Sequence, residues 1–146
     1  MTGIFKWGFV DSVGVELFDK QHKRIIAMIN QLHQSILNRE SHLVLAQILQ
    51  EMLDYSEVHF WHEEVAMEKY GYPEYDLQRK AHKNFIAKIK EFQDKFRKKE
   101  AKLEVSIIDF LFKWWMNHIR ICDKKYEQFF KGKEIHFSNE DIDKKS

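Results

Sequence analysis

The sequence has only one cysteine, Cys122, among its 146 residues. A single thiol excludes an intramolecular disulfide, a cysteine-based zinc site and an iron–sulfur cluster, because each of these needs several cysteines. A charge excess of either sign is also lacking, since 24 Lys and Arg balance 23 Asp and Glu. The formal charge of +1 therefore gives no reason to expect nucleic acid or an anionic membrane surface as a partner.

Long hydrophobic runs are missing as well. No uninterrupted apolar stretch approaches the roughly 18 residues of a membrane span, and the N-terminus lacks the basic-then-apolar pattern of a signal peptide. We therefore expect no membrane insertion and a cytoplasmic location. The chain is nevertheless long enough to bury a single hydrophobic core.

Glycine and proline are scarce and unevenly placed. Three of the five glycines lie in the first fourteen residues, and between Val15 and Lys131 only Gly71 and the single proline, Pro73, interrupt the chain. Apolar residues recur at helical spacing in four segments between these breaks. The predicted helices are 19–38, 41–69, a third from 74 or 76 to 97, and 103–130. Ser41 is the expected N-cap of the second.

Four long helices with short connections predict an all-α fold, an antiparallel up-down-up-down four-helix bundle. We expect one domain over residues 1–132, in which residues 1–18 form an N-terminal arm packed on the bundle. A polar C-terminal tail follows at 133–146.

Histidines and carboxylates occur on all four predicted helices. Imidazole suits iron, zinc and copper, and a carboxylate with two oxygens can bridge two cations. Several histidines with one Glu and one Asp therefore favour a non-haem centre of two irons over a four-ligand zinc site. The candidate metal ligands are His22, His59, Glu63, His82, His118 and Asp123.

The spacing of these ligands fits an α-helix in one case and not in another. His59 and Glu63 are four residues apart, so their side chains lie about 40° from each other around the helix. His118 and Asp123 are five residues apart, which corresponds to about 140° of rotation. Regular α-helical geometry therefore does not bring this second pair together.

The sequence resembles the hemerythrins, and most closely the short single-domain bacteriohemerythrins, up to about Phe130. The motifs that carry the resemblance are Trp7, Val13-Gly14-Val15, Asp19-x-Gln21-His22-Lys23, His59-Phe60-x-x-Glu63-Glu64 with Met67, Gly71-Tyr72-Pro73, His82, and Trp114-x-x-x-His118-Ile119 followed by Asp123.

This resemblance implies a four-helix bundle that holds two non-haem irons with an oxo or hydroxo bridge. Glu63 and Asp123 would be the two bridging carboxylates, and the family uses the same five-residue spacing before the aspartate. His22 and His59 would bind the iron that keeps an open position for dioxygen. His82 and His118 would bind the second iron.

The chain departs from the family pattern at two positions. The family places a third histidine ligand of the second iron four residues before His82, where this chain has Gln78. Its amide oxygen is a weaker ligand than imidazole, so Gln78 would bind iron directly, act through a water, or not bind. The family also usually has a leucine over the dioxygen pocket, where this chain has Trp115. The tryptophan would narrow that pocket or donate a hydrogen bond within it.

The remaining histidines and Cys122 have simpler interpretations. We assign His33, His42 and His136 to the surface or to satisfied core positions. His62 either supports the neighbouring Glu63 or is exposed. Cys122 is expected to be a buried, inert thiol.

Together these observations predict a di-iron protein that binds dioxygen for storage, delivery or sensing, and that is not an enzyme. Dioxygen is the expected small-molecule partner, and the sequence names no protein partner. The alternative, which rests on Gln78, is a di-iron site with altered reactivity towards peroxide or nitric oxide. That alternative includes weak peroxidase or oxidase activity, or iron sequestration.

Overall fold

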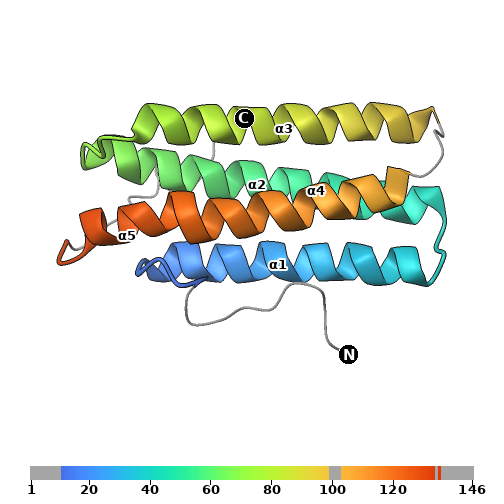
Figure 1. The fold of residues 1–146 in the computed structure, drawn as a ribbon, viewed down its shortest axis with the longest axis horizontal. Helices are drawn as coiled ribbons and strands as arrows, with labels where there is room; N and C mark the ends of the chain where they lie inside the picture. Colours follow the sequence, from blue (N-terminus) through green and yellow to red (C-terminus); the bar gives the residue numbers. More distant parts are fainter. Residues whose placement is uncertain (1–10, 99–102, 134, 136–146) are drawn as a thin grey trace.

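The computed structural model describes residues 11–98, 103–133 and 135. Its helices lie side by side along the long axis of the molecule (Figure 1). The helices are α1 (Glu16–Leu37), α2 (His42–Lys69), α3 (Tyr75–Arg97), α4 (Leu103–Asn117) and α5 (Lys124–Phe130). From α1 to α4 each helix contacts the next, and α4 also packs against α1, which closes the bundle.

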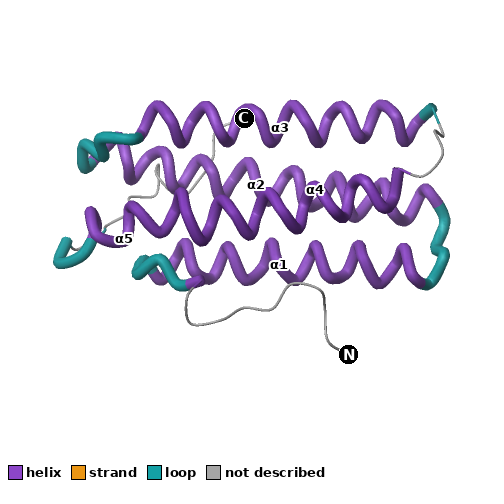
Figure 2. Tube along the Cα trace, viewed as in Figure 1, coloured by secondary structure: helices purple, strands orange, loops and turns teal. Residues whose placement is uncertain are grey.

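A short π-helix, His118–Asp123, joins α4 to α5, and we call it the π turn. The three segments form one rod in Figure 2. The all-α four-helix bundle expected from the sequence is therefore confirmed. The prediction of one regular α-helix over 103–130 was right in extent but wrong at the π turn.

The first helix begins three residues earlier than predicted, at Glu16. The Asp19 carboxylate accepts hydrogen bonds from the Val13 backbone N–H at 2.8 Å and from the Ser12 hydroxyl at 2.7 Å. Asp19 therefore lies within the first turn and fixes the chain that enters it, instead of starting the helix.

The next boundaries follow local chemistry. Ser41 caps α2 as predicted, since its hydroxyl accepts the Val44 N–H at 3.3 Å. The α2 helix ends before Gly71, whose φ of +71° is in the left-handed region that favours glycine. The proposed domain limits at residues 18 and 132 stay predictions, because 1–10 and 136–146 lie outside the described residues.

The hydrophobic core has two parts, separated along the bundle axis. The larger contains residues from all four long helices, including Ile25, Phe60, Phe85 and Trp115. The smaller lies where α1 begins and α5 ends, and it includes Phe18, Met67 and Tyr126 together with Val13 and Val15 from the chain before α1. The candidate ligands lie near the boundary between these two sets, so the polar site has apolar side chains on both sides along the bundle.

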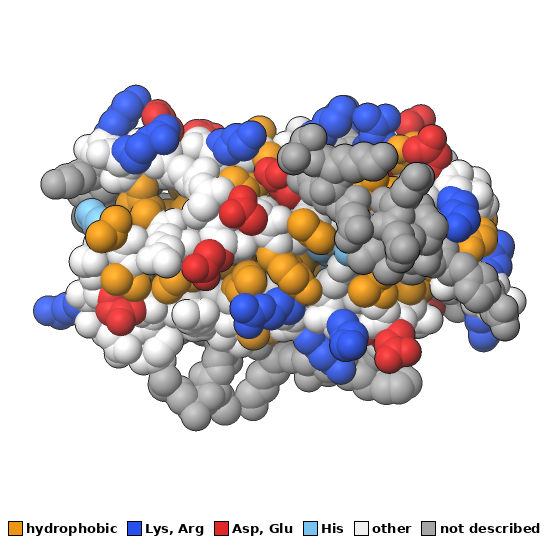
Figure 3. Space-filling view, turned by 180° about the vertical axis from the view of Figure 1, so that it is seen from behind, with side chains coloured by type: hydrophobic (Ala, Val, Ile, Leu, Met, Phe, Trp, Pro, Cys, Tyr) orange, Lys and Arg blue, Asp and Glu red, His pale blue; other side chains and the backbone are white. Residues whose placement is uncertain are grey.

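The surface is mixed in charge. Figure 3 shows basic, acidic and hydrophobic side chains interspersed over the face seen from behind. Among the described residues, no helix is both long enough and apolar enough to cross a membrane.

Candidate metal centre

All six predicted ligands meet inside the bundle. These residues are at most 2% exposed, and they come from α1, α2, α3 and the π turn. Two groups of them have ligand atoms within 4.8 Å of one another. The first group is His22, His59, Glu63 and Asp123; the second is Glu63, His82 and His118.

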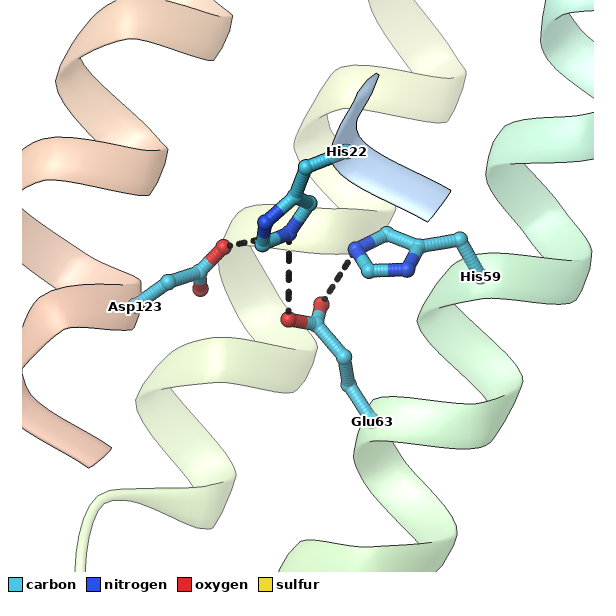
Figure 4. A group of neighbouring side chains, drawn as sticks. All are labelled: His22, His59, Glu63 and Asp123. Carbon is cyan, nitrogen blue, oxygen red and sulfur yellow. Dashed lines mark ion pairs between the residues drawn. The ribbon is translucent and has the colours of Figure 1, made fainter. Parts of the chain in front are cut away.

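The first group is drawn in Figure 4, where two imidazoles and two carboxylates point toward one another. His22 Nε2 lies 3.2 Å from Asp123 Oδ2 and 3.6 Å from Glu63 Oε2. His59 Nε2 lies 3.1 Å from Glu63 Oε1. Two donors bound at right angles to one cation at about 2.1 Å are about 3 Å apart. These separations therefore suit ligands of one metal, which we call the first position.

The second position lies between His82 and His118, whose Nε2 atoms are 3.2 Å apart. Glu63 Oε1 is 3.4 Å from His82 Nε2, and Asp123 Oδ1 is 3.1 Å from His118 Nε2. Both carboxylates thus contact imidazoles of both positions. This arrangement lets Glu63 and Asp123 each link two cations.

The π turn explains how His118 and Asp123 come together. In a π-helix the backbone hydrogen bonds join residues five apart, so such residues become neighbours on one face. The turn begins at His118 and ends at Asp123. The 140° separation expected for a regular α-helix is therefore removed by a local change in winding.

Unpaired buried atoms show that the donor set fits a cation. His22 Nε2, His59 Nε2, Glu63 Oε1 and Asp123 Oδ2 are buried and have no hydrogen-bond partner among the residues that the structure describes. They lie close together without being oriented to hydrogen-bond one another. Buried polar atoms are normally satisfied. Because these four converge, the residues present fit cations held between them.

Two imidazoles are oriented by neighbours that the sequence did not identify as functional. His59 donates from Nδ1 to Gln21 Oε1 at 2.7 Å, and the Gln21 amide donates to His62 Nδ1 at 2.6 Å. His82 donates from Nδ1 to Glu64 Oε2 at 2.8 Å. Each hydrogen bond leaves the Nε2 lone pair directed at the site. The sequence signal for Gln21 and Glu64 was their place in the two motifs that contain His22 and Glu63, which gave them no role.

Tyr126 is a further residue that sequence reasoning missed. Its hydroxyl donates to Glu63 Oε2 at 2.5 Å, and the side chain is fully buried. Burial and the nearby carboxylates raise the pKa of Tyr126 well above its usual value, so the phenol stays protonated. Tyr126 therefore fixes the orientation of Glu63.

Gln78 lies beside the second position and is 4% exposed. Its Nε2 donates to Asp123 Oδ1 at 3.1 Å. Its Oε1 is buried and has no hydrogen-bond partner in the part of the chain that the structure describes. Gln78 is thus part of the site through Asp123.

Aromatic rings enclose the two positions differently. Phe60 stacks on His82 with ring centroids 3.9 Å apart, and Trp114 stacks on His118 at 4.4 Å. Trp115 lies 6.3 Å from His22 and 6.0 Å from His59, ring centre to ring centre. It is fully buried, and its indole N–H has no acceptor among the described residues.

The other histidines divide as follows. His62 is buried and bonded to Gln21, so the exposed alternative for it is wrong. His42 is exposed and pairs with Glu104, and His33 is partly exposed, as expected. His136 lies outside the described residues. Cys122 is partly exposed, not buried, because it lies on the wall of a surface cavity.

The charges of the metal-free site balance one another. Burial lowers the pKa of His22 and of His118, but the carboxylates of Asp123 and Glu63 outweigh it and raise these values to about 9 and about 10. Burial lowers the pKa of His59 to about 4. The pKa values of Glu63 and Asp123 are lowered, against burial, by the facing imidazoles. Burial also lowers the pKa of His82, but the carboxylates of Glu63 and Glu64 outweigh it and raise the value. Imidazolium groups therefore offset the carboxylates of the site near pH 7.

We expect metal binding to release protons. A metal must displace the protons of His22 and His118, and any proton on His82, so anaerobic loading with ferrous iron at pH 7 should release at least about two protons per chain. Iron affinity should rise with pH up to the region of 9 to 10, where these groups lose their protons. Calorimetric titration in two buffers of different ionisation enthalpy measures the release. Loading with no proton release would contradict this account.

Both the sequence and the fold of this chain are similar to those of known proteins. Residues 13–130 match the family model of the hemerythrin HHE cation binding domain. A bacteriohemerythrin of Pseudomonas aeruginosa (strain LESB58) is 36% identical over 115 residues, covering 79% of this chain and 74% of the relative. One from Stenotrophomonas maltophilia (strain R551-3) is 32% identical over 131 residues, covering 88% and 83%. A wild-type hemerythrin structure superposes with a TM-score of 0.79 at 28% identity, covering 86% of this chain and 96% of that one. The chain belongs to the hemerythrin family.

Proposed function

We propose that the protein holds two non-haem irons, linked by Glu63, Asp123 and an oxo or hydroxo bridge, and binds dioxygen reversibly. The observation that carries this proposal is the convergence of four imidazoles and two shared carboxylates in a buried site. His22 and His59 would hold the first iron, and His82 and His118 the second. The irons would supply the electrons that dioxygen binding needs.

The surroundings of the first position support a binding role. Phe18, Phe60 and Trp115 lie beside His59, with ring centroids between 5.8 and 6.1 Å from it. An apolar enclosure excludes water and so protects a reversible site from side reactions. We propose that the Trp115 N–H, which has no acceptor within the described part of the chain, donates to dioxygen when it enters. The protein would then serve storage, delivery or sensing, and would not act as an enzyme.

The proposal is tested by anaerobic loading with ferrous iron, a count of bound iron per chain, and admission of dioxygen. We expect two irons per chain and a visible absorption band that appears with dioxygen and disappears when dioxygen is removed. One iron per chain would refute the paired site. A band that decays without reversing would refute reversible binding.

Gln78 favours a second candidate function. Its side chain donates to Asp123, and the structure shows no third imidazole beside His82 and His118 among the described residues. A second iron with fewer ligands would react more readily with peroxide or nitric oxide, or would be lost to a chelator. The cytoplasmic location expected from the sequence stays a prediction.

A further inference from the structure

The two metal positions have donor sets of equal size. The first has the imidazoles of His22 and His59, and the second has those of His82 and His118, with Glu63 and Asp123 reaching both. Two histidines with carboxylate oxygen leave room on a non-haem iron for ligands from solution. By this count the second position is as open as the first.

A cavity of about 80 Å³ leads to the second position. His118, Gln78 and Cys122 form its inner wall, while the exposed Leu77 and Lys125 form its outer wall. The cavity therefore runs from the surface to an imidazole of the site. Since a water molecule occupies about 30 Å³ in the liquid, this volume suits a ligand of one to three heavy atoms.

Gln78, whose side chain lines this cavity, also has an unsatisfied buried acceptor. Its Nε2 is engaged with Asp123 Oδ1 at 3.1 Å, whereas its buried Oε1 has no hydrogen-bond partner in the described chain. A buried amide oxygen is normally paired. A water or hydroxide bound to the second iron would pair with it, and the amide's second N–H is a donor that an anion could use.

We propose that the second iron binds its own small exogenous ligand through this cavity, with Gln78 as the hydrogen-bonding residue and not as an iron ligand. The resident ligand is water or hydroxide, exchangeable for a small anion. This inference rests on the proposed function, because it requires two bound irons. It gives the protein two ligand positions, one beneath Trp115 and one beside Gln78.

The test counts anions on the loaded protein. The protein is loaded with iron, oxidised to the ferric state with ferricyanide, and titrated with azide by calorimetry and infrared spectroscopy. We expect two azides per pair of irons. The Gln78→His variant, which supplies an imidazole ligand, should bind one azide and lose iron to a chelator about tenfold more slowly.

Two further variants keep the inference falsifiable. Gln78→Leu can neither ligate iron nor hydrogen-bond, so it should still bind two azides, the second about tenfold more weakly. Gln50→Leu makes the same chemical change at an exposed position of α2, away from the site, and should match the native protein. One azide on the native protein and two on Gln78→Leu would make Gln78 an iron ligand and overturn the inference.

The iron count tests the proposed function, and the azide count tests the second ligand position. Fewer than two irons per chain would refute the proposed function, and the inference with it. Two irons with one azide on the native protein and on every variant would overturn only the second ligand position.

Discussion

Replacing Glu63 by glutamine should abolish the paired-iron site. Glu63 is the only ligand on α2 that contacts imidazoles of both positions, at 3.1 Å from His59 and 3.4 Å from His82. A neutral amide of the same size keeps the packing but removes an anionic ligand from both irons. Mutation of a residue that only hydrogen-bonds to a metal ligand already lowers metal affinity by about 10–100-fold. Loss of the ligand itself should exceed that range.

The measurements are the iron content of the purified variant and its Mössbauer spectrum, which distinguishes coupled from isolated irons. We expect one iron per chain or fewer and no coupled pair. Circular dichroism of the metal-free variant verifies that the bundle is intact. A Glu63→Gln protein that retains two coupled irons would show that Glu63 is not a bridge.

Two matched variants separate this effect from general damage. Tyr126→Phe removes only the hydroxyl that holds Glu63 Oε2, so it should keep the pair and lose iron about tenfold faster. Glu51→Gln makes the same chemical change on the exposed side of α2 and should leave iron content unchanged. We expect iron retention to decrease from the native protein to Tyr126→Phe and then to Glu63→Gln. This order would show that a direct ligand holds the metals more strongly than a residue that only orients a ligand.

The bundle could be predicted from the sequence because its determinants are local. Apolar spacing, the Ser41 cap and the break at Gly71 and Pro73 all act within a few residues, and they located the helices. The one displaced start, at Glu16, depends on hydrogen bonds from Ser12 and Val13 to Asp19. These bonds form only once the preceding chain folds back, which helical periodicity does not encode.

The site was harder to predict where its geometry departs from the regular helix. The pairing of His118 with Asp123 depends on the π turn, and residue spacing alone argued against it. The hydrogen-bond partners of the ligands could not be predicted for a different reason. Gln21 meets His59 and Tyr126 meets Glu63 across helices far apart in the chain, so only packing brings them together.

The role of Gln78 could be predicted only in part from the sequence. Its place four residues before His82 marked it as a substitution at a ligand position, and the sequence left three roles open. The hydrogen bond to Asp123 and the unpaired Oε1 come from a residue 45 positions away and from burial. The hydrogen bond places Gln78 at the site, and the azide and chelator measurements on its variants distinguish the three roles.

Replacing Trp115 should change both ligand release and stability, and two substitutions separate the causes. Trp115→Phe keeps an aromatic ring against Phe60, which stacks on it at 5.5 Å, but removes the indole N–H. Loss of a hydrogen bond of about 1.4 kcal/mol should speed dioxygen release about tenfold. The free energy of unfolding should change by less than about 1.5 kcal/mol, because the ring is largely conserved.

Trp115→Leu should have a larger effect on folding. Trp115 is fully buried in the main core, so the smaller side chain leaves a cavity and should lower the free energy of unfolding by about 2–4 kcal/mol. It also opens the space above His22 and His59, so dioxygen should enter and leave faster than in the phenylalanine variant. Stopped-flow spectroscopy of the ferrous protein and urea unfolding measure the two effects.

The matched control is Trp114→Phe. It makes the same chemical change one residue away, on a ring that stacks on His118 and whose N–H is not among the unpaired buried atoms. It should leave dioxygen release within about twofold of the native rate, since it removes no donor from the first position. If Trp115→Phe releases dioxygen at the native rate, the indole N–H does not contact the ligand, and Trp115 shapes the pocket by volume alone.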